Sequence, residues 1–520
     1  MKKVGLFTLL ILLGHTNSFA ATFTWAEKSG NYAAICSDSK GNLYTTAGTP
    51  IIKYNSAGKV LKSIGNAGTG SFTGLAIKAD SLDNIYLAGE FTNIFKLGTI
   101  SVTSKGSADA VLVKMDSTGK VLWMVSGGGT GIDQANALSV DNEGNAYLAG
   151  EYYSASAFFG SQTITGTGLI NLFTAKYDKD GTLQWIRTAE STNQNNDIQC
   201  GSVAVDQSGN CYVAGSYYDS AYFNGKLYTT VNHGSNAFIA CYSGLGSFLW
   251  FKQMANSGVA SIQTDKNGNL YTTGYFGPQT DFDNIHLEVK GNGMYVGNIF
   301  VSKMDASGKV IWANRAGSDY SDNGAALVLD ASNNIYVTGS FSDTADFGNS
   351  NLVSNGEHDF FVAKYDNNGN KLWVVGTGGE AEDGSYSLCL NPAQTMVYII
   401  GSAQIGPIKY GNQVLPDPAE NGFDFIAAVG DIDAGIEPPN QVTGLEVYPN
   451  PSAGNFNIHI DETISSGSIL HIIDMEGHQI SEQQILPGQN EVFVDNMQAG
   501  MYLLSIENKN VVMCKKLIVQ

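Results

Sequence analysis

Residues 366–375 read DNNGNKLWVV, a phrase that occurs several times in this chain. Close copies are DSTGKVLWMV at 116–125, DKDGTLQWIR at 178–187 and DASGKVIWAN at 305–314. An Asp followed three residues later by Gly favours a tight turn, because the Asp side chain caps backbone N–H groups and Gly accepts a positive φ. The apolar residues and tryptophan that follow the turn predict a β-strand. The phrase therefore indicates a recurring β-hairpin.

A second phrase places a tyrosine in every repeat, as in GNAYLAGEY at 144–152. Successive tyrosines are 59 to 65 residues apart, except for a first spacing of 42. Each unit shows two predicted strands around an Asp-Gly turn, then a long connection, then two more strands around the tryptophan turn. Tight glycine turns without a helical period predict a four-stranded antiparallel meander. The seven marker tyrosines are Tyr44, Tyr86, Tyr147, Tyr212, Tyr271, Tyr336 and Tyr398.

Both faces of each predicted sheet are apolar. In the last tryptophan strand, Trp373 points to one face while Leu372 and Val374 point to the other, because side chains alternate along a strand. Such sheets must stack on a neighbour on each side, and closure into a ring does this for every copy. An open solenoid would instead need polar caps at both ends.

The two ends of the repeat region favour the ring. The last unit, FDFIAAVGDID at 423–433, lacks a tryptophan strand, whereas ATFTWAEKSG at 21–30 is a tryptophan strand without a unit. Joining them completes one blade and protects the sheet edges. We therefore expect an all-β chain with a seven-bladed β-propeller over residues 21–431, closed by its N-terminal strand. The shared tryptophan position holds Trp25, Trp123, Trp185, Trp250, Trp312 and Trp373, with Lys62 in the first unit.

The units resemble bacterial SBBP-type β-propeller repeats. The resemblance rests on phrases such as GNAYLAGEY, FFVAKYD at 360–366 and the tryptophan after the glycine turn, and it covers residues 21–431. It implies the propeller fold. It implies no single reaction, because that family is defined by its repeat.

Residues 1–20 have the pattern of a secretory signal peptide. Lys2 and Lys3 precede the apolar run VGLFTLLILLG, and small residues Ser18 and Ala20 precede the expected cleavage after Ala20. The apolar run is too short to span a bilayer, and no other run is long enough. We expect the mature chain to have no transmembrane segment.

The C-terminal part differs from the repeats. Residues 432–444 contain a Pro pair and predict a linker, and residues 445–520 alternate short strands and turns, which predicts a small β-sandwich. This segment resembles the C-terminal sorting domain of the type IX secretion system of Bacteroidetes. The matching residues include Tyr448, Pro449, Asn450, Pro451, Gly454, Phe456, Asp474, Gly477, Gly500, Met501 and Tyr502. The resemblance implies the secretion machinery as a partner and a route through the periplasm to the outer-membrane surface or the medium.

Composition limits the partners. A formal charge of −20 over 520 residues argues against nucleic acid and anionic membranes, because both would repel the protein. We expect a monomer. The six scattered cysteines predict buried thiols inside strands, with a disulfide between Cys211 and Cys241 as an alternative if their side chains face each other. The cysteines are Cys36, Cys200, Cys211, Cys241, Cys389 and Cys514.

The binding surface is expected on the face opposite the Asp-Gly hairpins. The long connections and the crossings between blades should meet there, and loops of variable length commonly bind ligands. The crossings are rich in acidic groups that could bind a carbohydrate or a divalent cation, or simply be solvated. The candidate residues are Asp133, Glu190, Asp197, Asp319, Asp322, Glu380, Glu382 and Asp383.

Cofactors, metals and catalytic residues are not indicated. His233, His286 and His358 lie in three long connections but at non-equivalent positions, and the Asp-rich turns lack the closing Glu of a calcium loop. The first unit has a very short connection, from Gly48 to Lys53 around Pro50, which predicts a notch in the ring. The notch could admit an extended ligand or reflect divergence of a terminal repeat.

Three functions remain open from the sequence. The favoured one is a non-enzymatic surface protein that binds a glycan or a protein. The second is a polysaccharide lyase or hydrolase that uses carboxylates of the crossings, because paired carboxylates can cleave glycosidic bonds. The third is a structural adhesion or envelope component whose repeats serve as a rigid spacer.

Overall fold

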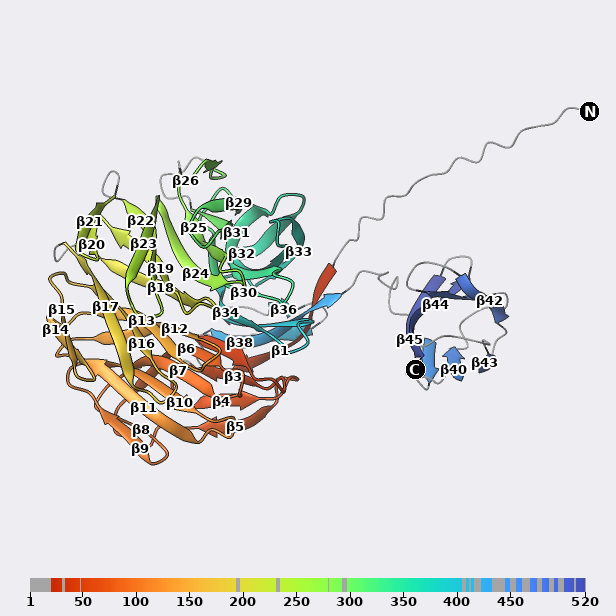
Figure 1. The fold of residues 1–520 in the computed structure, drawn as a ribbon. Coiled ribbons are helices and arrows are strands. Elements are labelled where there is room, and N and C mark those ends of the chain that lie inside the picture. Colours follow the sequence, from red (N-terminus) through yellow and green to blue (C-terminus); the bar gives the residue numbers. More distant parts are fainter. Residues whose placement is uncertain are drawn as a thin grey trace, which may run out of the picture. The chain divides into compact units, whose positions relative to one another are not determined.

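A computed structural model describes residues 20–29, 33–46, 48–192, 197–230, 234–278, 280–291, 297–404, 408–410, 413–415, 422–432, 445–448, 455–460, 468–474, 479–485, 491–493, 500–508 and 511–519. Every regular element in these residues is a β-strand. The chain divides into one compact unit of residues 18–432 and a second unit that contains residues 433–520. The first unit is a seven-bladed β-propeller, as expected (Figure 1).

Each blade is a four-stranded antiparallel sheet. Blade 1 holds β2 (Ala34–Ser37), β3 (Leu43–Thr46), β4 (Ile51–Tyr54) and β5 (Val60–Ile64). Blade 2 holds β6 (Phe72–Ala79), β7 (Ile85–Phe91), β10 (Asp109–Met115) and β11 (Val121–Gly128). Blade 3 holds β12 (Asp133–Val140), β13 (Ala146–Tyr152), β16 (Asn171–Tyr177) and β17 (Leu183–Ser191). Blade 4 holds β18 (Ile198–Val205), β19 (Cys211–Tyr218), β22 (Ser235–Tyr242) and β23 (Phe248–Ala255).

The remaining three blades have the same order. Blade 5 holds β24 (Ser257–Thr264), β25 (Leu270–Phe276), β28 (Asn298–Met304) and β29 (Val310–Ala316). Blade 6 holds β30 (Asn323–Leu329), β31 (Ile335–Asp346), β32 (Asn351–Tyr365) and β33 (Lys371–Thr377). Blade 7 holds β34 (Asp383–Leu390), β35 (Met396–Ala403), β38 (Phe423–Ile432) and, from the other end of the chain, β1 (Ala20–Ser29).

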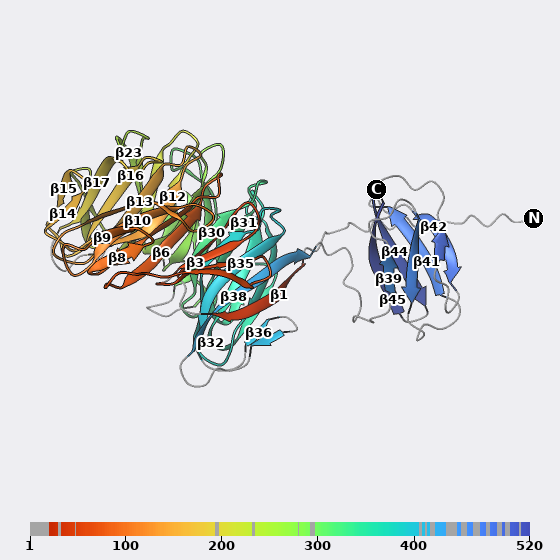
Figure 2. The same cartoon turned by 90° about the horizontal axis from the view of Figure 1, so that it is seen from below.

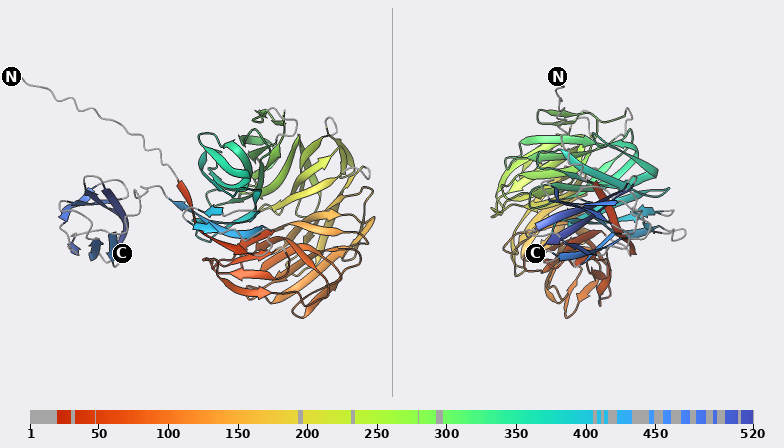
Figure 3. Two further views of the ribbon diagram at one scale, coloured as in Figure 1. Left: turned by 180° about the vertical axis from the view of Figure 1, so that it is seen from behind. Right: turned by 90° about the vertical axis from the view of Figure 1, so that its right-hand side faces the viewer.

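The ring is closed through the first strands of the blades. Strands β2, β6, β12, β18, β24, β30 and β34 each contact the next, and β34 contacts β2. Views from the front and from behind show the same circular order of blades (Figures 1 and 3). The stacking buries both faces of each sheet, which is the physical reason that the sequence repeats an apolar pattern on both faces.

The N-terminal strand completes blade 7. β1 pairs antiparallel with β38 along its length (Figure 2). Trp25 lies opposite Ala428 in this pairing. The same register occurs in other blades, where Trp123 lies opposite Lys114 and Trp373 opposite Lys364. In all three sheets the pairing skips the residue directly before the tryptophan. The expected closure by the strand of Trp25 is therefore confirmed.

The repeated tryptophan connects neighbouring blades. Its indole N–H donates to a backbone oxygen in the tryptophan turn of the next blade: Trp123 to Lys179 at 2.9 Å, Trp185 to Gly244 at 3.1 Å and Trp250 to Ala306 at 3.2 Å. Four of the rings, those of Trp123, Trp185, Trp250 and Trp373, also pack on the marker tyrosine of their own blade; the centroids of Trp123 and Tyr86 are 6.0 Å apart. A large apolar ring with one polar atom suits such an interface.

The long connections contain a feature that sequence reasoning missed. Five of them form a short two-stranded hairpin, and in blade 6 the ends of β31 and β32 extend to form the sixth. All but one place a phenylalanine in the core, for example Phe159, which is 1% exposed and packs on Phe173 with ring centroids 4.7 Å apart; the hairpin of residues 408–415 buries Ile408 instead. The hairpins are β8 (Ile94–Leu97) with β9 (Ile100–Thr103), β14 (Ser156–Phe159) with β15 (Gln162–Thr165), β20 (Ser220–Phe223) with β21 (Lys226–Thr229), β26 (Thr280–Phe282) with β27 (Ile285–Leu287), and β36 (Ile408–Tyr410) with β37 (Gln413–Leu415).

Blade 1 lacks this hairpin because its third strand begins five residues after the second ends. β3 stops at Thr46 and β4 starts at Ile51, so the connection is the tight turn expected around Pro50. The first blade is therefore the shortest of the ring.

Five cysteines are free and buried, as expected for thiols inside strands. The alternative disulfide is excluded in this structure. Cys211 lies opposite Tyr242 while Tyr212 lies opposite Cys241, so the two cysteines are one residue out of register. Their side chains therefore point to opposite faces of the sheet.

The second unit contains two small sheets. One consists of β39 (Leu445–Tyr448), β40 (Asn455–Ile460) and β43 (Glu491–Phe493). The other consists of β42 (Gln479–Ile485), β41 (Ser468–Asp474), β44 (Gly500–Asn508) and β45 (Val511–Val519). Tyr502 is buried in β44, whereas Pro449, Asn450, Pro451, Gly454 and Gly477 lie outside the described residues. The expected signal peptide also lies outside them up to residue 19, and so does the expected linker beyond residue 432.

Candidate functional site

The two faces of the propeller differ in the connections that they present. One face carries the Asp-Gly turns inside each blade, and we call it the hairpin face. The other, the long-loop face, carries the long connections after the second strands and the crossings between blades. Each face has a cavity of ligand size.

The hairpin face is built from one repeated cluster of side chains. In blade 3, Asp141 Oδ1 accepts the backbone N–H groups of Glu143 and Asn145 at 3.0 and 2.9 Å, and Asp141 Oδ2 accepts Asn145 Nδ2 at 2.8 Å. The hydroxyl of Tyr147 lies 3.3 Å both from Asp141 Oδ2 and from the carbonyl oxygen of Gly209 in the next blade. Lys176 lies over the Tyr147 ring, 5.0 Å from its centroid.

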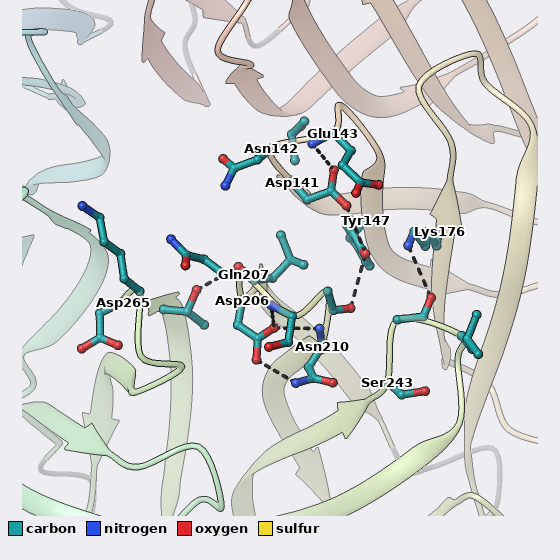
Figure 4. Close-up of a pocket in the computed structure, with 18 residues that line it drawn as sticks. Asp141, Asn142, Glu143, Tyr147, Lys176, Asp206, Gln207, Asn210, Ser243 and Asp265 are labelled. Carbon is teal, nitrogen blue, oxygen red and sulfur yellow. Dashed lines mark hydrogen bonds between the residues drawn. The ribbon is translucent and has the colours of Figure 1, made fainter.

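A cavity of about 670 Å³ opens among these turns in blades 3 to 5 (Figure 4). Its labelled side chains include Asp141, Asp206 and Asp265, each of which already caps its own turn. Burial, followed by the charge of Asp141, raises the pKa of Tyr147 far above its usual value, so this hydroxyl stays protonated. These three carboxylates are therefore engaged in their own turns, while Tyr147 and Lys176 bond to blade 4 through the carbonyl oxygens of Gly209 and Gly244.

The long-loop face has the larger cavity, of about 910 Å³, between blades 4, 5 and 6. Two half-exposed tyrosines line it, Tyr218 at 47% and Tyr275 at 39% exposure, together with backbone and small polar side chains. A neighbouring cavity of about 610 Å³ shares Ser321 and His358 with it. We call the larger one the long-loop cavity; its lining is Tyr218, Gly234, Ser235, Asn256, Tyr275, Gly277, Pro278, Gly297, Ser321, Asp322, Asn323, Ser340 and His358.

The acidic candidates from the sequence do not meet in one cluster. Asp322 lines the long-loop cavity, and Asp319 is exposed on the same crossing between blades 5 and 6. Glu380 and Glu382 are exposed on the crossing between blades 6 and 7. Glu190 ends β17 in blade 3, where its Oε2 accepts Thr167 Oγ1 at 3.1 Å, and Asp197 precedes β18.

Three of the candidates are buried at the first residue of a blade or next to it. Asp133, Asp322 and Asp383 are at most 3% exposed. Asp322 accepts the backbone N–H of Ser318 at 2.5 Å and that of Ser342 at 2.9 Å. Burial raises the pKa of Asp322 although these hydrogen bonds oppose the rise. These carboxyl groups hold the crossings in place beneath the surface.

The aromatic lining was missed from the sequence. Five residues after the marker tyrosine, blade 4 has Tyr217 and blade 5 has Phe276. Tyr218 directly follows Tyr217, and Tyr275 directly precedes Phe276. A second aromatic residue at the end of the marker strand was the available signal, because Tyr217 and Phe276 are buried in their blades while their neighbours Tyr218 and Tyr275 line the cavity.

The described parts of the chain contain no group of three or more His, Cys, Asp or Glu side chains that could hold a metal ion. His286 is exposed and lies 2.6 Å from Asp281, His358 lines the long-loop cavity, and His233 lies outside the described residues. No helix among the described residues is long and apolar enough to cross a membrane.

Comparison with protein families identifies the C-terminal part. Residues 446–520 match the family model described as a secretion system C-terminal sorting domain. The chain is thus a seven-bladed β-propeller with a type IX secretion C-terminal sorting domain, and it is secreted or placed at the cell surface. The sorting domain implies interaction with the secretion machinery.

Comparison with individual proteins finds distant similarities. A WD repeat-containing protein of Acanthamoeba polyphaga mimivirus, uncharacterised, is 29% identical over 38% of this chain; the match spans 17% of the viral protein's length. The solved structure of PorZ, a surface component of the type IX secretion system of Porphyromonas gingivalis, is 11% identical, covers 94% of this chain and 82% of its own, and has a TM-score of 0.23. Sqt1 from Chaetomium thermophilum is 10% identical, covers 74% of this chain and 97% of its own, and has a TM-score of 0.38. At these TM-scores no property passes from the solved structures to this chain.

Proposed function

We propose that the propeller is a carbohydrate-binding protein delivered to the cell surface, and that the long-loop cavity is its binding site. The observation that supports this most is the pair of half-exposed tyrosines, Tyr218 and Tyr275, that line a cavity of about 910 Å³. The volume falls within the range of small-molecule sites, and such sites combine aromatic surface with a few polar groups.

The chemistry of the lining suits a sugar. A tyrosine ring offers apolar area at low entropic cost, and it can pack on the apolar C–H face of a pyranose. Asn256, Asn323 and Ser340 supply amide and hydroxyl groups that can exchange hydrogen bonds with sugar hydroxyls. Asn323 Oδ1 is buried and has no hydrogen-bond partner among the described residues, so it could accept a bond from a bound hydroxyl.

Further assignments of the repeats and of the two ends of the chain accompany this proposal. The repeats are proposed to be of the SBBP type, on the marker phrases, and residues 445–520 to be a small β-sandwich built from the two sheets of the second unit. That unit is proposed to act as an export address and to take no part in binding. The proposed signal peptide, residues 1–20, would direct the chain to the periplasm first.

The test is binding to a glycan array, followed by calorimetry on the sugars found. Removing the ring in Tyr218→Ala or Tyr275→Ala should weaken binding roughly tenfold, because each aromatic contact is worth about 1 kcal/mol or more. Tyr222→Ala is the control, since Tyr222 is 42% exposed and does not line this cavity. Equal loss in the control, or no loss in either cavity variant, would contradict the proposal.

The same experiment separates the other two functions. Products of bond cleavage from a bound polysaccharide would favour the lyase or hydrolase. If no soluble sugar binds but cells lose attachment when the gene segment for the propeller is deleted, the structural role is favoured instead.

A further inference from the structure

Neighbouring blades meet through a repeated pair of side chains on the long-loop side. At the junction of blades 5 and 6, Asn298 begins the third strand of one blade and Asp322 precedes the first strand of the next. Asn298 Nδ2 lies 3.3 Å from Asp322 Oδ2. A Cβ atom on Gly317 would lie 2.6 Å from Asp322 Oδ2 and 2.9 Å from Asn298 Nδ2, so the glycine makes room for the pair.

At the junction of blades 6 and 7, an aspartate replaces the asparagine. Asp359 and Asp383 take the two positions, and Gly378 takes the place of the glycine. A Cβ atom on Gly378 would lie 2.3 Å from Asp359 Oδ1 and 2.8 Å from Asp383 Oδ2. Asp359 Oδ1 therefore stands where the donating Nδ2 of Asn298 stands at the other junction.

Asp359 Oδ1 is buried and has no hydrogen-bond partner among the described residues. The other oxygens of the pair are all satisfied by donors. Asp359 Oδ2 accepts the backbone N–H of Asn355 at 2.9 Å and Asn355 Nδ2 at 3.2 Å. Asp383 Oδ2 accepts the backbone N–H of Gly379, and Asp383 Oδ1 accepts that of Gln404 at 3.1 Å.

The junction of blades 2 and 3 places Asp109 and Asp133 at the same two positions, but Asp109 Oδ1 accepts a hydrogen bond from Ser104 Oγ at 3.4 Å, and the oxygen without a partner among the described residues is Asp133 Oδ1. Both side chains are 0% exposed. Lys105 N–H donates to Asp109 Oδ2 at 3.0 Å, as Asn355 does to Asp359, and Gly129 N–H donates to Asp133 Oδ2 at 2.7 Å. A Cβ atom on Gly128 would lie 2.7 Å from Asp109 Oδ1.

Two ionised carboxylates this close and this buried would repel each other strongly, because little water screens them. We propose that each pair holds one proton at mildly acidic pH, that Asp359 donates it to Asp383, and that Asp109 and Asp133 share one in the same way. The protonated oxygen then does what the amide nitrogen of Asn298 does at the junction of blades 5 and 6. The two carboxyl pairs thus form hydrogen bonds that connect neighbouring blades. This inference does not depend on the carbohydrate site.

The surroundings agree with a proton and disfavour a cation. Burial, together with the charge of Asp383, raises the pKa of Asp359 to about 6, although the hydrogen bonds from Asn355 and the adjacent His358 oppose the rise. Glu382 pairs with His358 through a parallel β-bridge, and Asp322 interacts electrostatically with His358. The Asp109 pair faces Lys105. Backbone N–H groups point at both pairs, whereas a calcium ion would require carbonyl and carboxylate oxygens.

The pH dependence follows from the direction of the pKa change. In the unfolded chain an Asp loses its proton near pH 4, whereas Asp359 keeps it until about pH 6. The folded protein thus binds more protons than the unfolded chain between these values, so the stability from the pair is lost as the pH rises through that window. Below about pH 4 both states are protonated and the contribution is complete.

The test compares variants with the same change in charge. Asp359→Asn places an amide donor toward Asp383 and should keep or raise the melting temperature at about pH 8, while removing the fall in melting temperature between about pH 4 and pH 6. Asp383→Asn is the matched control. It turns an amide N–H toward backbone N–H donors and should lower the melting temperature by roughly 2 °C or more at every pH.

Isotope-edited infrared spectroscopy gives a readout that does not depend on unfolding. The wild type at about pH 5 should show the C=O band of protonated carboxyl groups, which should shrink in Asp359→Asn and shrink further in the double variant with Asp109→Asn. An unchanged band would overturn the proposal. So would equal destabilisation by Asp359→Asn and Asp383→Asn, or a calcium-dependent rise in melting temperature that both variants abolish.

Discussion

At the residue scale, the repeated Asp-Gly phrase forms a fixed set of hydrogen bonds within each turn. Asp206 illustrates this. Its Oδ1 accepts the N–H groups of Ser208 and Asn210 at 2.9 and 2.8 Å, while its Oδ2 accepts Asn210 Nδ2 at 2.8 Å and the Tyr212 hydroxyl at 2.9 Å. One carboxylate thus fixes the turn and the buried tyrosine together, which explains why Asp, Asn and Tyr recur at fixed spacing.

We expect Asp206→Ala to destabilise the propeller by about 3 kcal/mol, because four donors lose their acceptor and the Tyr212 hydroxyl is buried. Asp305→Ala is the comparison, since Asp305 accepts only from Ser307 and Lys309 in an exposed turn and should cost about 1 kcal/mol. Thermal unfolding of the two variants measures the difference. Equal shifts would contradict the role given to the tyrosine.

The residue scale also marks the limit of the sequence. An Asp in a crossing can be exposed or buried beneath its loop, and the sequence alone does not distinguish these two cases. Asp319 is exposed, whereas Asp322, three residues later, is buried and bonded to two backbone N–H groups. Burial of Asp133 and Asp383 depends on contacts between blades, which linear spacing does not reveal.

At the scale of the element, hairpins of the long connections extend the sheet of the preceding blade, as β14 does with β11 and β20 with β17. β14 pairs with β11 of the preceding blade through Phe159 opposite Gly127 and Phe158 opposite Gly128. A Cβ atom on Gly127 would lie 2.1 Å from the Phe159 ring, so only a glycine leaves room for that ring. The aromatic-glycine pairs were visible in the sequence, but strands of four residues among polar neighbours give no clear period.

Phe159→Ala should cost about 3–5 kcal/mol, because it empties a buried site between two blades. Phe158→Ala is the matched control, since Phe158 is the adjacent residue of the same strand and is 44% exposed. Thermal unfolding should show a large shift for the first variant and a small one for the second. Similar shifts for both would mean that the hairpin adds strand pairing alone.

At the scale of the whole molecule, the number of blades and their closure were predictable, because a period of about 62 residues and two complementary fragments are visible without tertiary information. The sequence predicted the face of the propeller on which a binding site would lie, but not the position of the cavity on that face. Which blades form it depends on the side chains that three neighbouring blades present, such as Tyr218, Tyr275 and His358.

Removal of residues 445–520 should leave the propeller in the periplasm, because the matched sorting domain is then absent. Fractionation of cells that express the truncated and full-length chains measures this. The truncated propeller should retain the melting temperature of the full-length propeller, since residues 18–432 form a compact unit. Normal surface delivery of the truncated chain would refute the role of the tail as an address.

The most direct test of the closed ring is hydrogen–deuterium exchange on peptides that cover residues 21–29 and 423–430. Their backbone groups pair along β1 and β38, so both peptides should be protected and should lose protection together as denaturant is added. Rapid exchange of residues 21–29 while residues 423–430 stay protected would show that the N-terminal strand does not complete the seventh blade.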